Sequence, residues 1–238
     1  MVSNGKYGVV TGFFLFLGLT TLGFFIYSAA IQYREYERTV IAKGLSEREV
    51  KSDIVLWPIR FTVTDNDLGK VYRLIDINSR KIQQFLLAKG IGDEEISFAI
   101  PSITDKVAQQ YGGGRQAPFR YTASGTVTVY SKKVDQVRHI MSSLSELGRQ
   151  GIVFSDAEYA SRPEYIFTGL NGIKPAMIEE ATRKAREVAE KFAADSHSGL
   201  GKIRKARQGQ FTITPRDKNN PHIKKIRVVS TVEYYLSD

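Results

Sequence analysis

The longest apolar stretch of the chain lies close to its N-terminus. Residues Tyr7 to Tyr33 contain no charged side chain, with Lys6 before them and Arg34 after them. A helix needs about 20 apolar residues to cross the hydrocarbon core of a membrane. The pattern therefore predicts a single transmembrane anchor over residues 7–33, preceded by a short tail of residues 1–6.

The alternative interpretation of this stretch is a cleaved export signal. Lys6 would supply the basic start of such a signal, and Ser28-Ala29-Ala30 offers small residues at a cleavage position. The apolar part of a typical signal is only about 7–15 residues long, and this stretch is clearly longer. We interpret it as an uncleaved anchor.

Beyond the anchor, strand-like and helix-like patterns follow one another. Residues 50–65 alternate between apolar and polar positions, with Pro58 at a bulge or an edge position. Asn66 or Asp67 is a candidate N-cap for the first helix. The predicted helices cover residues 68–89, 133–150 and 175–193, and the predicted strands cover 39–42, 50–65, 95–104, 119–130, 152–154, 164–169, 202–214 and 223–236.

The order of these elements favours an α+β fold for residues 34–238, taken as one soluble domain. Helices separated by pairs of strands suit an antiparallel or mixed sheet with three main helices on one face. Residues 50–155 have the βαββαβ order of a ferredoxin-like unit, and a further helix and more strands follow it.

Composition limits the chemistry of this domain. The formal net charge is +9, so anionic lipids or acidic partners are candidates. Acidic residues are interspersed among the basic ones, and a soluble surface that happens to be basic explains the charge equally well. The chain has no cysteine, which excludes disulfides, thiolate catalysis and cysteine-based metal sites.

No pattern in the chain indicates catalysis. Gly199-Leu200-Gly201-Lys202 lacks both the first glycine and the Ser or Thr of a phosphate-binding loop, and it follows a helix. Asp195-Ser196-His197 contains the residue types of a triad, but neighbours in sequence rarely converge as a triad requires. We expect a polar helix end there, and no enzyme activity, cofactor or metal site.

Basic residues gather near the C-terminus and are the best candidates for binding. The cluster comprises Lys202, Arg204, Lys205 and Arg207. Strand alternation predicts that Lys202 and Arg204 share a face with Gln208, where they would meet phosphate or lipid headgroups. The alternative is a solvated face or an edge protected by charge. Aromatic residues are not interleaved there, so no nucleic acid is expected.

Several segments resemble the SIMPL-domain family. They are Val40 to Gly44, Leu45 to Val50, Phe167-Thr168-Gly169-Leu170-Asn171-Gly172-Ile173-Lys174-Pro175, Ala185-Arg186, Ala189 to Ala193, and Arg227 to Tyr234. The resemblance implies an α+β domain that is usually exported across the bacterial inner membrane. Its relatives include a periplasmic antigen that forms a ring-like homo-oligomer, and proteins named for oxidative-stress defence. The resemblance implies no functional residues.

The charges beside the anchor and the resemblance disagree about orientation. The positive-inside rule counts Lys6 on one side against Arg34, Arg38, Lys43 and Arg48 on the other, which favours a cytoplasmic domain. Because large domains translocate largely regardless of charge, we follow the family. We expect an inner-membrane, single-pass, non-enzymatic protein that self-assembles in the periplasm. The alternative function is a binding module for an anionic lipid or small ligand.

Overall fold

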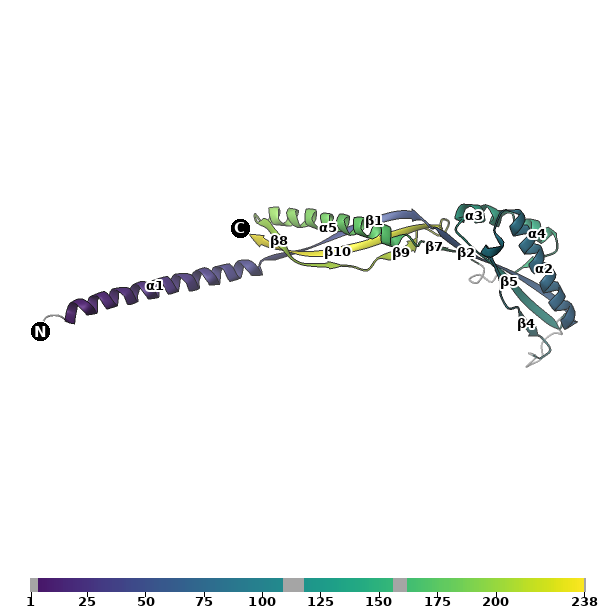
Figure 1. Ribbon diagram of the computed structural model, residues 1–238, viewed down its shortest axis with the longest axis horizontal. Helices are drawn as coiled ribbons and strands as arrows, with labels where there is room; N and C mark the ends of the chain where they lie inside the picture. The colour runs from purple at the N-terminus through teal and green to yellow at the C-terminus, as the bar shows by residue number, and fades with distance from the viewer. Residues whose placement is uncertain (1–3, 109–117, 156–161, 238) are drawn as a thin grey trace. The chain divides into compact units, whose positions relative to one another are not determined.

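The chain folds as an α+β protein with an N-terminal apolar helix, which confirms the predicted fold class. The computed structural model describes residues 4–108, 118–155 and 162–237 (Figure 1). They form two compact units: residues 1–48, 173–212 and 227–238, here called the terminal unit, and residues 49–172 and 213–226, here called the middle unit.

The middle unit is built on a six-stranded sheet. Its elements are β2 (Ile54–Asp65), α2 (Leu68–Ala88), the 3₁₀ turn η1 (Asp93–Glu95), β3 (Ile96–Phe98), β4 (Ser102–Asp105), β5 (Tyr121–Ser131), α3 (Val134–Ser142), α4 (Ser145–Arg149), β6 (Val153–Phe154) and β7 (Glu164–Ile166). The strand order is β3-β5-β2-β6, with β4 also pairing with β5 and β7 with β2. β5 lies between β2 and β3, the strands that flank α2, which agrees with the predicted ferredoxin-like unit.

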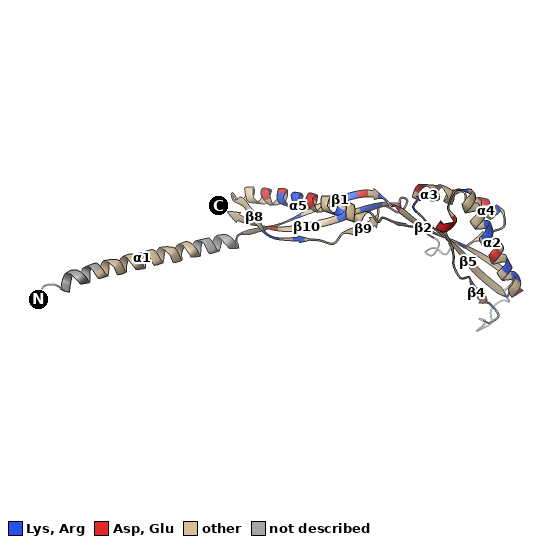
Figure 2. Cartoon of the chain, viewed as in Figure 1, with Lys and Arg blue, Asp and Glu red and all other residues tan. Residues whose placement is uncertain are grey.

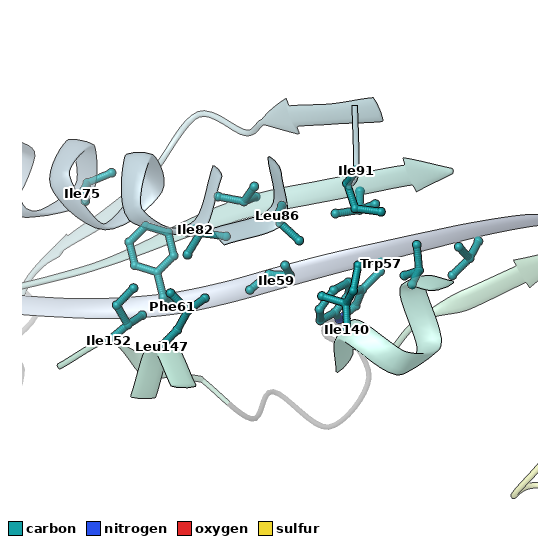
Figure 3. Close-up of a cluster of buried hydrophobic side chains, with 14 of the residues drawn as sticks. Trp57, Ile59, Phe61, Ile75, Ile82, Leu86, Ile91, Ile140, Leu147 and Ile152 are labelled. Atoms are coloured by element: carbon teal, nitrogen blue, oxygen red, sulfur yellow. The ribbon is translucent and has the colours of Figure 1, made fainter. Parts of the chain in front are cut away.

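One face of this sheet carries the core. Trp57, Ile59 and Phe61 of β2 point toward the helices, where they meet α2 and the α3–α4 region (Figure 3). α2 starts at a side-chain cap, since Asp67 Oδ1 accepts a 2.9 Å hydrogen bond from Lys70 N. Phe61 lies directly opposite Gly125 of β5, and its ring fills the space that a Cβ at Gly125 would need.

The terminal unit joins the apolar helix to a second sheet. It contains α1 (Asn4–Glu37), β8 (Gly199–Gln208) and most of β1 (Thr39–Lys51), α5 (Leu170–Asp195) and β10 (Ile223–Ser237). β9 (Thr212–Pro215) begins at the last residue of the range 173–212 and continues in the middle unit. The strand order is β1-β10-β8, with β9 also pairing with β10.

Small residues hold α5 against this second sheet. Its buried positions recur every fourth residue: Met177, Ala181, Ala185, Ala189 and Ala193. Ala42 and Gly44 of β1 are buried beneath them, and a Cβ at Gly44 would collide with the backbone of Ala181 and Ala185. The helix can therefore lie on the strand only because this position has no side chain.

Several predicted elements have different limits in the structure. β1 is longer than the predicted strand 39–42. Its buried positions hold small residues, so they do not stand out in a hydropathy pattern. The predicted strand 95–104 divides into β3 and β4 around Pro101, the predicted helix 133–150 into α3 and α4 after Ser142, and the predicted strand 202–214 into β8 and β9. α5 begins at Leu170, so Pro175 lies inside the helix and not in its first turn.

Candidate functional site

The first candidate region is α1, whose apolar surface is bare. Thr11–Ala29, 19 residues with a mean hydropathy of 1.7, is long and apolar enough to cross a membrane. None of this segment is buried against other described residues, and Figure 2 shows its described part without charged residues. Length and composition suit either a membrane anchor or an export signal. Ser28 and Ala29, the candidate cleavage residues, lie inside a continuous helix.

The sheet of the terminal unit begins directly where α1 ends. Only Arg38 separates the last residue of α1, Glu37, from the first residue of β1. The carbonyl oxygen of Arg38 accepts a 2.9 Å hydrogen bond from Leu236 N of β10. Leu236 in turn pairs with Leu200 of β8. The start of β8 therefore lies at the same end of the sheet as the end of α1.

The second candidate region is the basic cluster, which lies on β8 at an edge of the terminal sheet. Glu233 of β10 pairs with Lys205 and Tyr234 pairs with Ile203, so the register skips Arg204. Tyr234 is buried with the alanines of α5, which places Glu233 on the opposite, open face of the sheet. A β-bulge, in which one strand has an extra residue, changes the face of the sheet on which the neighbouring side chains lie.

This shift changes which basic residues share a face. Arg204 Nη1 donates a 2.9 Å hydrogen bond to Glu233 Oε1, and Lys205 and Arg207 line a cavity with Glu233. Arg204, Lys205 and Arg207 therefore lie together on the open face. The predicted grouping of Lys202 and Arg204 with Gln208 was wrong for Gln208, which pairs with Ser230, a buried residue on the α5 side. Lys202 is exposed on the same strand.

A shallow cavity of about 230 Å³ opens among these basic side chains. Ile41 and Thr231 complete its lining, together with Lys205, Arg207 and Glu233. The positive charges outnumber the single carboxylate, and Arg204 already pairs with that carboxylate. The arrangement can hold a small anionic group between Lys205 and Arg207. Sequence reasoning missed Ile41, Thr231 and Glu233 because the order of strands in the sheet was not visible.

The other polar clusters have structural roles. Glu180 of α5 accepts hydrogen bonds from Ser46 Oγ at 2.9 Å and forms an ion pair with Lys184 at 2.8 Å. The Lys184 bond, with help from Ser46, lowers the pKa of Glu180 to about 2. After α5, Ser198 N donates to Ala193 O, and His197 adopts a φ of 55°. Residues 195–198 therefore form the polar helix end that the sequence predicts.

The remaining basic residues near the C-terminus do not line this cavity. Arg216, Lys218 and Lys224 belong to the middle unit. Arg216 Nε donates a 2.8 Å hydrogen bond to Asp217, and burial lowers the pKa of Lys224. Among the residues that the structure describes, no three His, Asp or Glu side chains gather in a way that would hold a metal ion.

Comparison with known proteins assigns the fold to a family. The SIMPL family, described as proteins of unknown function (DUF541), matches residues 40–232, a range that takes in both units. No curated protein matches the chain. The match spans most of the sequence and agrees with the segments that carry the resemblance. The chain belongs to the SIMPL family.

Proposed function

We propose that this protein is a non-enzymatic, membrane-anchored SIMPL protein that self-assembles into a ring- or cage-like homo-oligomer in the periplasm. In this proposal α1 remains attached and spans the inner membrane once. The protein acts as a structural component of the envelope and contributes to its protection, including protection from oxidative stress. The partners are further copies of the same chain and the lipid around α1.

The sheet edge formed by β1, which pairs with no described strand on its outer side, carries this proposal. β1 and β8 are the outer strands in the order β1-β10-β8. Unpaired strand edges are templates for pairing with another chain, and charged side chains protect them. The charged residues of β8 are all basic, whereas β1 carries charges of both signs and also exposes Ile41 and Leu45, which are 62% and 37% exposed. The β1 edge is therefore the more favourable contact between copies.

The anchor strengthens this tendency to associate. Because β1 follows α1 almost directly, chains held in one membrane present this edge in the same layer. Tethering raises the effective concentration of the edges without any new contact. A ring requires a head-to-tail contact rather than a self-complementary one, so β1 would pair with a different surface of the next copy.

Mass photometry of the full chain in a nonionic detergent tests assembly. We expect particles larger than one chain plus its micelle, and a strict monomer at micromolar concentration would refute the proposal. Ile41→Lys with Leu45→Lys should reduce the assembled fraction, because both add charge at the β1 edge. Leu87→Lys is the matched control, since Leu87 of α2 is 41% exposed and lies in the other unit.

Anchoring and orientation need their own measurements. Mass spectrometry of the membrane-extracted protein should show an intact N-terminus, and loss of residues before Ala30 would identify an export signal instead. Protease added to spheroplasts should digest the soluble part while a cytoplasmic marker stays intact. Protection of the soluble part from protease would place it in the cytoplasm.

A second candidate function is contact with anionic headgroups through Lys202, Arg204, Lys205 and Arg207. The bulge that collects three of these residues on one open face favours it. Lys202 is two residues along β8 from Leu200, about 7 Å at strand spacing, and Leu200 lies at the α1 end of the sheet. A basic residue close to an anionic surface contributes about 1 kcal/mol.

Hydrogen exchange in nanodiscs separates this function from the first. We expect slower exchange of β8 in phosphatidylglycerol than in phosphatidylcholine at low salt, and the same rate for both lipids after all four residues are changed to Gln. The control variant changes Lys70, Arg73, Arg80 and Lys81 of α2 to Gln, which removes the same charge from the middle unit. Equal exchange of the unaltered protein in both lipids would exclude the headgroup contact.

A further inference from the structure

The sheet of the middle unit has a notch in its outer edge. β6 pairs with β2 at Phe61 and Thr62, and β7 pairs with it at residues 54–56. Among the described residues, no strand pairs with residues 57–60 on that side. The notch is therefore bounded by β6 at one end and by β7 at the other.

The backbone of the notch explains how a proline fits in a central strand. Arg60 O accepts a 3.1 Å hydrogen bond from Ser155 N on the outer side of β2. Pro58 has the same alternation as Arg60, so its ring nitrogen also faces outward. A proline has no N–H to donate, and on this side no described strand requires one. Of the two predicted alternatives, a bulge or an edge position, the pairing of the described strands favours the edge.

A cavity of about 290 Å³ lies at this notch. It is lined by the apolar residues Trp57, Pro58, Ile59, Leu144 and Phe154 and by the polar residues Arg60 and Ser155. Ligand pockets are commonly apolar, with a few polar groups that fix the orientation of the ligand. The volume lies at the small end of the range for such pockets.

Arg60 is the unusual member of this lining. Its Nε atom is buried and has no hydrogen-bond partner in the described part of the chain, and none of the ion pairs found there involves Arg60. Arg120 of the same unit, by contrast, donates twice to Asp105, at 3.1 and 3.0 Å. A buried donor without a partner is costly, so a bound acceptor at Arg60 would be stabilised.

We infer that the notch binds a small apolar carboxylate, with an aromatic or branched aliphatic body. The guanidinium of Arg60 receives the carboxylate, since its planar fork matches that group. The body of the ligand packs against Trp57 and Phe154. This site is independent of the proposed assembly, because all its residues belong to the middle unit.

Trp57 provides a direct readout, because it is the single tryptophan of the chain. The probes are phenylacetate and isovalerate, each compared with its uncharged amide, phenylacetamide or isovaleramide. Added to the full chain in a nonionic detergent, the acids should change the Trp57 emission saturably, with Kd on the order of 1 mM for ligands of this size. The amides should bind at least tenfold more weakly, because they lack the charge that pairs with Arg60.

Variants connect the signal to Arg60. Arg60→Gln should weaken acid binding at least tenfold, and Arg60→Lys should retain part of it. Arg73→Gln on α2 removes the same charge elsewhere in the unit and should leave binding unchanged. Circular dichroism reports whether the variants fold. If Arg60→Gln does not fold, the comparison of acid with amide on the unaltered protein still tests whether the notch binds a carboxylate. Equal binding of acid and amide, or no saturable change at about ten times the expected Kd, would overturn the inference.

Discussion

Gly44 offers the sharpest test of how α5 packs on the terminal sheet. In Gly44→Ala, the added Cβ would overlap Ala181 O and come too close to Ala185 N. Both are backbone atoms of a helix, so no side-chain rotation can relieve the collision. Either α5 must move away from β1, or β1 must bend away from α5.

The magnitude follows from two opposing effects. Without the collision, replacing Gly by Ala would stabilise the fold by about 0.4–1 kcal/mol, because the unfolded chain loses freedom. Overpacking a close contact costs about 1–3 kcal/mol, occasionally more. A displaced α5 would also lose contacts between Ala185 or Ala189 and the buried Val232 and Tyr234. We therefore expect a net loss of about 1–2 kcal/mol.

Hydrogen exchange across a urea series measures this loss where it occurs. The two units need not unfold together, so one global transition is not assumed. Amides of α5 should lose protection at lower urea in Gly44→Ala, while the Trp57 fluorescence transition, which reports the middle unit, should keep its midpoint.

A matched glycine controls for the general effect of adding a methyl group. At Gly148 of α4, no atom beyond its chain neighbours and its own helix backbone lies within 4 Å of where an added Cβ would sit. Gly148→Ala should therefore stabilise its helix by about 0.5–1 kcal/mol. If α5 of Gly44→Ala keeps its full protection, the close packing of α5 on β1 is wrong.

Three further changes test other contacts. Gly125→Ala should destabilise the middle unit by about 1–3 kcal/mol, because its Cβ would collide with the Phe61 ring; the Trp57 transition in urea measures this. The pKa of Glu180 falls to about 2 on folding, so its stabilising effect is present above pH 4.5 and is lost as the pH falls toward 2. Glu180→Gln should flatten this dependence in α5 exchange. Burial lowers the pKa of His222, so the middle unit should lose stability below pH 6.5, and His222→Phe should remove that loss; an unchanged pH profile would contradict it.

How far the sequence predicted the fold depended on what each element buries. β2 alternates large apolar residues with polar ones, and β5 alternates small and apolar residues with threonines and a serine; both were found near their true limits. β1 buries Ala42, Gly44 and Ser46, which resemble surface residues in a hydropathy pattern. They are small because α5 lies close above them. The length of β1 therefore followed from a contact with α5, more than 100 residues away, which no local pattern contains.

The basic residues show the same limit for a candidate site. Their identity was visible in the sequence, and alternation is the correct starting rule for a strand. The bulge at Arg204 overturned that rule, because one skipped residue reverses the faces of the positions that follow it, and a second shift occurs between Tyr234 and Leu236. Only the register against β10 shows that Lys205 and Arg207 join Arg204. The acidic Glu233, which reduces the net charge of the cavity, comes from that same neighbouring strand.

Pro58 connects a local signal to a site that no local signal indicated. A proline in an alternating strand predicts an edge or a bulge, and the structure places it at an edge inside the sheet, between β6 and β7. The same break in pairing leaves space beside Trp57 and Arg60. Continuous pairing along β2 would fill that space with another strand. Pro58, which needs no hydrogen-bond partner for its nitrogen on this side, thus also lines the cavity. Binding of a ligand at Arg60 would give this gap in the sheet a function.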